Sequence, residues 1–136
     1  MAFILDASVT CAWIFADEAV PAVDALQDNL GVEGAWVPPF WWLEVANVLV
    51  QSARRGRIEM ATVSQRLAEL GRMNIHPSPV EPDIETVVDL SLTHGLTTYD
   101  ALYLAHARRL LLPLATLDEP LRRAATVEGL AVWPAG

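Results

Sequence analysis

The sequence predicts a single α/β domain with a short, mainly parallel sheet. Short apolar runs alternate with longer stretches of helical periodicity, which is the pattern of a parallel sheet with helical crossovers. The chain has 136 residues, the usual length of one domain, so residues 1–136 are expected to share one core. A hydrophobic content of 53% and a mean hydropathy of +0.31 are typical of a compact fold rather than a disordered chain.

The amino-terminal half should contain one buried strand and four helices. The apolar run that opens the chain stops at Asp6, Pro21 suits the first turn of a helix, and Gly56 ends a long helical stretch. The predicted elements are, in order, a strand at residues 2–5, helices at 8–16 and 21–30, a brief extended stretch at 36–39, and helices at 40–55 and about 62–73.

The carboxy-terminal half continues the same alternation. Gly95 ends one helix, Thr98 is the expected N-cap of the next, and Asp118 is the expected N-cap of the last. The predicted elements are a Pro-rich, extended loop at residues 74–82, helices at 84–94 and 99–111, a strand at 113–116, a helix ending near 126 and a strand within 130–134.

The formal net charge of −8 is a poor fit to a protein that binds nucleic acid by bulk attraction. All nine basic residues are arginines, which suit bidentate phosphate contacts. Arg54, Arg55 and Arg57 form one local cluster and are weak candidates for RNA contacts. The alternative, favoured by their position, is that they complement a helix dipole and keep the surface solvated.

No membrane span or signal peptide is expected. Every long apolar run is interrupted by a polar residue, and the amino terminus lacks a basic segment. Cys11 is the single cysteine, so no disulfide can form within the chain. These features suit a cytoplasmic protein.

Three aspartates fall where parallel α/β folds bind ligands, beyond the carboxyl ends of the strands. Asp6 follows the first strand, Asp118 follows the strand at 113–116, and Asp100 begins a helix. Each also has an ordinary explanation, as a helix N-cap or as a first-turn acid that meets the helix dipole.

Glu44 is harder to explain in that way. It lies in the run WWLEVANVLV, which we expect to pack into the interior, and it is expected to lie away from either helix end. One alternative is a buried glutamate that is protonated or hydrogen-bonded by Asn47, three residues on. The favoured alternative is a carboxylate that points into a polar cleft.

Four carboxylates in one cleft would repel one another and raise some of their pKa values unless a cation neutralised them. Oxygen ligands without Cys or His indicate Mg²⁺ or Mn²⁺. His76, His94 and His106 lack metal-ligand spacing, and no phosphate-binding glycine loop or serine-nucleophile motif is present. Carboxylate-bound divalent ions most often serve phosphoryl transfer and phosphodiester hydrolysis.

At these residues the chain resembles the PIN-domain ribonucleases, and among them the VapC-type toxins of bacterial toxin–antitoxin pairs. Three segments carry the resemblance and together span most of the chain. They are ILDASVTCAWIFADE, VPPFWWLEVANVLVQSARRGRI and LTTYDALYLAHARRLLLPLATLDEPLRRAA.

The resemblance implies a flavodoxin-like, three-layer α/β/α sandwich and an endoribonuclease that needs Mg²⁺ or Mn²⁺ and leaves a 5′-phosphate and a 3′-hydroxyl. The metal-binding and catalytic positions of the family fall on Asp6, Glu44, Asp100 and Asp118. Its supporting polar positions, which orient the acids or bound waters, fall on Ser8, Asn47 and Thr116.

The resemblance also implies partners: a homodimer, a cellular RNA substrate such as tRNA or rRNA, and a VapB-type antitoxin whose arginine enters the acidic cleft. Five tryptophans suit a chain with partner surfaces to cover, although core packing explains them equally well. Two alternatives are a PIN nuclease outside toxin–antitoxin systems and a non-catalytic PIN binding module. The second is disfavoured because all four acids are present.

Overall fold

The computed structural model describes residues 1–15 and 20–135, which form a five-stranded sheet in the order β3-β2-β1-β4-β5. Every pair of neighbouring strands is parallel, which confirms the predicted α/β class. The strands are β1 (Phe3–Leu5), β2 (Ala35–Val37), β3 (Ile75–Pro77), β4 (Leu114–Ala115) and β5 (Val132–Trp133).

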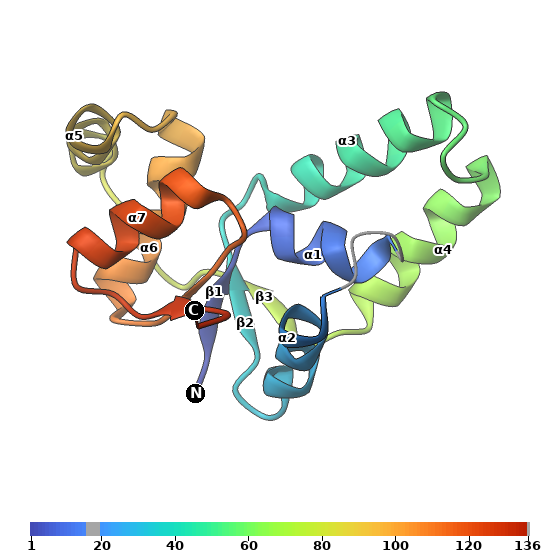
Figure 1. Ribbon diagram of the computed structural model, residues 1–136, viewed down its shortest axis with the longest axis horizontal. Coiled ribbons are helices and arrows are strands. Elements are labelled where there is room, and N and C mark those ends of the chain that lie inside the picture. The colour runs from blue at the N-terminus through green and yellow to red at the C-terminus, as the bar shows by residue number, and fades with distance from the viewer. Residues whose placement is uncertain (16–19, 136) are drawn as a thin grey trace.

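Helices cover both faces of this sheet (Figure 1). Because crossovers between parallel strands are right-handed, the steps from β1 to β2 and β3 and the steps from β3 to β4 and β5 place their helices on opposite faces. The first face carries α1 (Ala7–Ile14), α2 (Pro21–Asp24), the 3-10 helix η2 (Ala25–Leu30), α3 (Trp41–Arg54) and α4 (Met60–Gly71). The second face carries α5 (Ile84–His94), α6 (Thr98–Leu110) and α7 (Glu119–Val127).

The core is centred on β1, the middle strand. Its three residues are fully buried, as an apolar run between two helical layers should be. Helix α6 packs on this strand and contributes the buried Leu104 and Tyr103. Full burial of one large apolar side chain stabilises the fold by roughly 1.5–3 kcal/mol. This packing therefore fixes the strand that directly precedes Asp6.

Two predicted boundaries differ in the amino-terminal half. The helix expected at residues 8–16 is α1, which ends at Ile14, and Ala16 lies outside the described residues. The helix expected at 21–30 is one α-helical turn followed by η2. Both segments are short, and in short segments tertiary packing decides more than helix propensity.

Two predictions in the carboxy-terminal half were wrong. The Pro-rich segment at 74–82 was expected to be only a loop, but it contains β3, which pairs with β2. As an edge strand, β3 tolerates Pro77 because one side of its backbone forms no ladder. The N-cap of α6 is Thr97 rather than Thr98, since the Thr97 side chain accepts a 3.1 Å hydrogen bond from the Asp100 amide.

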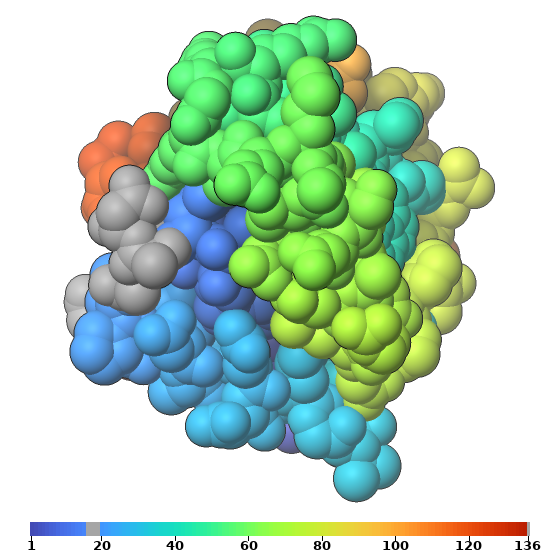
Figure 2. All heavy atoms as spheres, turned by 90° about the vertical axis from the view of Figure 1, so that its right-hand side faces the viewer, coloured from blue at the N-terminus to red at the C-terminus, as the bar shows by residue number. Residues whose placement is uncertain are grey.

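Figure 2 shows a hollow between the η2 and α4 segments, with α1 at its base. It is lined by Trp13, Gln27 and Leu70 among others and has a volume of about 300 Å³. None of the predicted site residues lines it. Across residues 1–15 and 20–135, no helix combines the length and the apolar character needed to cross a bilayer.

Candidate metal centre

All four predicted acids lie at the carboxyl edge of the sheet. Asp6 directly follows β1, and Asp118 follows the neighbouring strand β4 as the N-cap of α7. Glu44 and Asp100 occupy the first turns of α3 and α6. The connections leave β1 and β4 in opposite directions, and this switch point is where open parallel sheets bind ligands.

Asp6 is the most buried of the acids, with 6% of its surface exposed. One carboxylate oxygen, Oδ2, accepts hydrogen bonds from Ser8 Oγ at 2.6 Å and from Thr116 Oγ1 at 2.7 Å. The structure thus brings Ser8 and Thr116 to Asp6, where sequence reasoning expected supporting groups. Both donors engage the same oxygen, so Oδ1 is left for another partner.

The two hydroxyls also hold the loop that carries Asp118. Ser8 Oγ accepts a hydrogen bond from the Leu117 amide at 3.0 Å, and Thr116 Oγ1 accepts one from the Asp118 amide at 3.1 Å. Asp118 Oδ2 in turn accepts from the Leu121 amide at 3.0 Å. Asp118 is therefore a helix cap, as its ordinary explanation predicted. It also belongs to a group of acids that we call the carboxylate cluster: Asp6, Glu44, Asp100 and Asp118.

Glu44 is bonded by Tyr103, a residue that sequence reasoning missed. Tyr103 Oη donates a 2.9 Å hydrogen bond to Glu44 Oε2. Tyr103 lies three residues after Asp100 on α6, so helical spacing could have indicated that the two share a face. One expectation about Glu44 was wrong: it lies in the first turn of α3 rather than away from the helix ends. The alternative that was not favoured, a hydrogen bond from Asn47, is not what the structure shows, because the partner is Tyr103.

Asn47 points to solvent, and no hydrogen bond to it is present in the described structure. It is one turn along α3 from Glu44, on the exposed side of the helix. Its supporting role in the site stays a prediction.

Burial and mutual repulsion govern the charges of this cluster. Burial raises the pKa of Asp6, its hydroxyl donors lower it, and the charges of Asp100 and Asp118 raise it again. The pKa of Glu44 is raised by burial and then by Asp6 and Asp100, with Tyr103 opposing the change. Burial and the Asp118 charge raise the pKa of Asp100. Each acid thus lies within the electrostatic reach of at least one other.

A hard divalent cation suits this donor set. The available ligands are carboxylate oxygens, which Mg²⁺ and Mn²⁺ prefer, and a bound cation would offset the repulsion among them. Within the described residues, no three His, Cys, Asp or Glu side chains are arranged as a direct ligand set. Mg²⁺ retains several waters and takes few direct carboxylates, so the cluster fits a cation held partly through water.

Arg122 is a second residue that sequence reasoning did not single out for the site. Its guanidinium donates hydrogen bonds to the carbonyl of Thr116 at 2.8 Å and to that of Pro134 at 2.7 Å. It therefore ties the end of β4 to the chain that follows β5. Thr116, which donates a hydrogen bond to Asp6, is thus itself fixed by Arg122.

The remaining candidates lie elsewhere. Arg54 and Arg55 are exposed at the end of α3, and the Arg57 guanidinium stands 4.0 Å from the centre of the Phe15 ring. His76 is exposed, His94 pairs with Glu128 at 3.0 Å, and His106 is buried. None of the three histidines contacts Asp6, Glu44, Asp100 or Asp118 through a described contact. A role of the arginines in RNA binding stays a prediction.

Comparison with known proteins identifies the family. Residues 3–127 match the PIN domain family. The chain is 40% identical over 81 residues to Ribonuclease VapC3 of Pyrobaculum aerophilum, a match that covers 57% of this chain and 61% of that protein. The part matched is thus less than two thirds of the length of that curated relative.

Solved structures agree on the fold. The PAE2754 protein of Pyrobaculum aerophilum superposes with a TM-score of 0.73 at 25% identity, covering 97% of this chain and 92% of that one. FitAcB of Neisseria gonorrhoeae gives a TM-score of 0.58 at 21% identity, covering 97% of this chain and 96% of its own. FitAB bound to a DNA fragment gives 0.61 at 18%, with coverages of 98% and 94%. With its parallel sheet, its acids at the switch point and the match over residues 3–127, the chain belongs to the PIN domain family.

Proposed function

We propose that this protein is an endoribonuclease that needs Mg²⁺ or Mn²⁺ and acts as the toxin of a toxin–antitoxin pair. The observation that carries the proposal is the buried Asp6, whose raised pKa reflects burial and the charges of Asp100 and Asp118. Without a cation, repulsion among these acids opposes folding. The same cluster can bind a cation that also contacts a phosphate group. The similarity to a curated VapC ribonuclease supports this reaction over other uses of a carboxylate cluster.

Asp6, Asp100 and Asp118 would hold the cation, directly or through water. A divalent ion supplies two things when bound: it lowers the pKa of a bound water and neutralises charge on the scissile phosphate. Ser8 and Thr116 fix the Asp6 carboxylate by two hydrogen bonds to one oxygen, which leaves the other oxygen for the ion or its water.

Glu44 is assigned the proton chemistry of the attacking water. Burial raises its pKa above the ordinary value of 4.5, which moves it toward the range of an effective general base. The hydroxyl of Tyr103 fixes the direction of its carboxylate at 2.9 Å. Burial also raises the pKa of Tyr103, so that hydroxyl keeps its proton and is the donor in its bond with Glu44.

The partners of the protein follow from the same proposal. RNA would reach the cluster through the cation and local arginines, because a chain of net charge −8 does not attract it as a whole. A VapB-type antitoxin would cover the cluster, and an arginine of that antitoxin would replace the charge of the ion. Homodimer formation is part of the proposal. The exposed apolar side chains of Trp42 and Leu43 supply surface for such contacts.

The reaction is tested with purified protein freed of any bound partner by denaturation and refolding. Incubation with labelled single-stranded RNA and Mn²⁺ or Mg²⁺ should give products that end in a 5′-phosphate, and EDTA should stop cleavage. Asp100→Asn should abolish it, whereas Met60→Ala, an exposed residue away from the cluster, should not. Cleavage that survives EDTA, or no cleavage with either ion, would contradict the proposal.

The toxin role is tested separately in cells. Induced expression should arrest growth, and the Asp100→Asn variant should not. Growth arrest by both forms would exclude a nuclease toxin. If cells expressing the wild type keep growing although the purified protein cleaves RNA, the result would favour a PIN nuclease outside toxin–antitoxin systems.

A further inference from the structure

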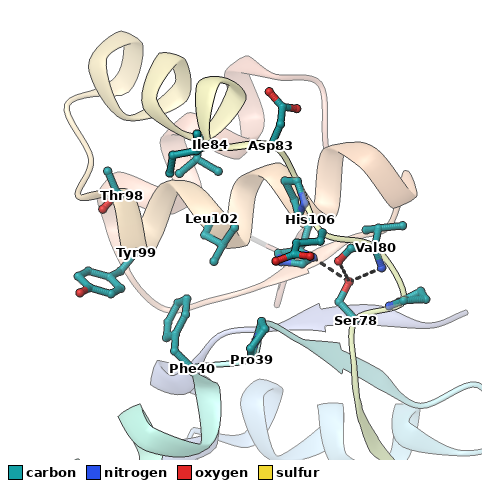
Figure 3. A pocket seen from close by; sticks show the side chains of 14 residues that line it. Pro39, Phe40, Ser78, Val80, Asp83, Ile84, Thr98, Tyr99, Leu102 and His106 are labelled. Carbon is teal, nitrogen blue, oxygen red and sulfur yellow. Dashed lines mark hydrogen bonds between the residues drawn. The ribbon is translucent and has the colours of Figure 1, made fainter.

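A large cavity of about 890 Å³ lies between α5, α6 and the start of α3. Figure 3 shows Tyr99 and Phe40 at one end of it, Leu102 in the middle, and Ser78 and His106 at the other end. The sides come from helices on one face of the sheet and from the Pro-rich segment after β3. The volume is sufficient for a planar heterocycle with its sugar.

The aromatic end of this pocket borders the carboxylate cluster. Tyr99 directly precedes Asp100 in the first turn of α6. The Phe40 ring stands edge-on to Tyr99 at 5.4 Å and to Tyr103 at 5.6 Å between ring centres. Tyr103 in turn donates its hydrogen bond to Glu44. An RNA strand with one phosphate at the carboxylate cluster would therefore have a neighbouring nucleotide beside Tyr99.

The lining disfavours phosphate and suits an uncharged ring. Among the described residues, no arginine lines the pocket, whereas the acids Glu81 and Asp83 line it. His106 adds no positive charge at neutral pH, because burial lowers its pKa to about 4. Its Nδ1 is instead 2.7 Å from Ser78 Oγ.

The Tyr99 ring has the exposure expected of a stacking platform. Its side chain is 63% exposed, although it makes a T-shaped contact with the Phe40 ring. Aromatic side chains stack on nucleobases of any sequence, because every base has a π face. Asp83 caps α5, and both of its carboxylate oxygens accept hydrogen bonds from Thr86. The Glu81 carboxylate is the acceptor offered to exocyclic amino groups, which adenine, cytosine and guanine carry and uracil lacks.

We infer that this pocket receives one unpaired, amino-bearing nucleobase of the RNA whose phosphate is bound at the carboxylates, with the base stacked on Tyr99. The inference rests on the proposed function and extends it, since it makes the pocket the part of the site that selects the cleavage position. A protein segment in the pocket is the competing occupant. Three features favour the base: the Glu81 carboxylate in the lining, the lack of arginine among the described lining residues, and the Phe40 ring that contacts both Tyr99 and Tyr103.

The test compares cleavage of short single-stranded RNAs that differ only at the nucleotides flanking one site. Tyr99→Ala should lower kcat/KM about tenfold, mostly through KM, and flatten the preference against uracil. Tyr99→Trp should restore both, because it keeps a stacking face. Met60→Ala, which removes another exposed apolar side chain, is the matched control. Equal kinetics and equal preferences in Tyr99→Ala and Met60→Ala would overturn the inference.

A binding measurement separates this inference from the reaction itself. Fluorescence anisotropy with a labelled RNA hexanucleotide and Mg²⁺ is measured in the Asp100→Asn background, with and without Tyr99→Ala. Binding weakened about tenfold supports the pocket even if the wild type cleaves no RNA, in which case only the proposed reaction fails. Unchanged RNA binding together with loss of self-association in Tyr99→Ala would assign the pocket to a protein segment and overturn the inference.

Discussion

The hydroxyl of Tyr103 donates a 2.9 Å hydrogen bond to the Glu44 carboxylate and thereby joins α6 to α3 at the carboxylate cluster. The two residues are 59 positions apart in the sequence. Tyr103 is fully buried, so its ring is fixed by packing and its oxygen has a defined position. The bond links the two helices that carry Glu44 and Asp100.

Tyr103→Phe should remove this bond and keep the ring. The bond lowers the pKa of Glu44, so its loss should raise that pKa further and shift the rise of kcat with pH to higher pH. The free energy of unfolding should fall by about 1 kcal/mol, the usual net contribution of one hydrogen bond. The measurement is kcat against pH for both proteins, with urea unfolding alongside. An unmoved pH profile would remove Glu44 from the proton transfer.

Asp118 combines two roles that substitution can separate. Asn is as good an N-cap as Asp, so Asp118→Asn should keep the bond to the Leu121 amide and leave stability nearly unchanged. Cleavage should nevertheless fall by at least tenfold, because the variant lacks a carboxylate charge that we propose binds the cation. Asp118→Ala should lose activity and also about 1 kcal/mol of stability. Thermal unfolding and initial rates of both variants make the comparison.

The cluster should also make stability depend on pH and on divalent ions. The folded-state pKa values of Asp6, Glu44 and Asp100 lie above their ordinary values of 3.8, 4.5 and 3.8. The folded protein therefore binds these protons more tightly, and the free energy of unfolding should fall as pH rises from the ordinary values through the raised ones. At neutral pH the ionised acids oppose folding.

Asp100→Asn should accordingly stabilise the ion-free protein at pH 7, by less than about 1 kcal/mol since the residue is partly solvated. Mg²⁺ at ten times its Kd should stabilise the wild type by about 1.4 kcal/mol and the variant by less. Differential scanning fluorimetry with Mg²⁺ and with EDTA measures both. An ion effect of equal size in the two proteins would place the ion elsewhere.

Much of the fold and most of the site could be predicted from local patterns. The strand before Asp6 is a short apolar run, and the Asp118 cap is indicated by an acid followed by Glu119 and Pro120. Such signals depend on backbone geometry within a few residues. For that reason they remain visible without any knowledge of tertiary contacts.

The failures concern contacts between distant segments. Tyr103 and Glu44 meet only because α3 and α6 converge at the sheet edge, so no local pattern in the sequence indicated this bond. Likewise β3 is a strand because β2 offers it a ladder, while its own sequence, IHP, is a poor strand former.

The capping of α6 gives a matched pair for a stability test. Thr97 accepts the hydrogen bond from the Asp100 amide, whereas Thr98 begins the helix, and both are exposed. Thr97→Ala should lower the free energy of unfolding by about 1 kcal/mol, and Thr98→Ala should change it by less than half of that. Urea denaturation of the two variants gives the difference. Equal losses would contradict the assignment of the cap.

His106 should make the fold sensitive to acid. It is 1% exposed, and burial lowers its pKa to about 4 from an ordinary value of 6.5. The unfolded chain binds this proton more tightly, so the stability that His106 contributes is complete above pH 6.5 and is lost as pH falls toward 4. The loss should reach about 3 kcal/mol at the acid end.

The carboxylates of the cluster act in the opposite direction over the same range, so His106 must be isolated by substitution. His106→Gln keeps a polar group that can bond Ser78 Oγ and cannot titrate. The variant should be less stable than the wild type at pH 7, because its packing is altered, and the two should converge as pH falls to 4. Free energies of unfolding from urea titrations at pH 4, 5, 6 and 7 test this. A constant difference between the two proteins would show that the pKa of His106 is the same in the folded and unfolded states, which would contradict the prediction.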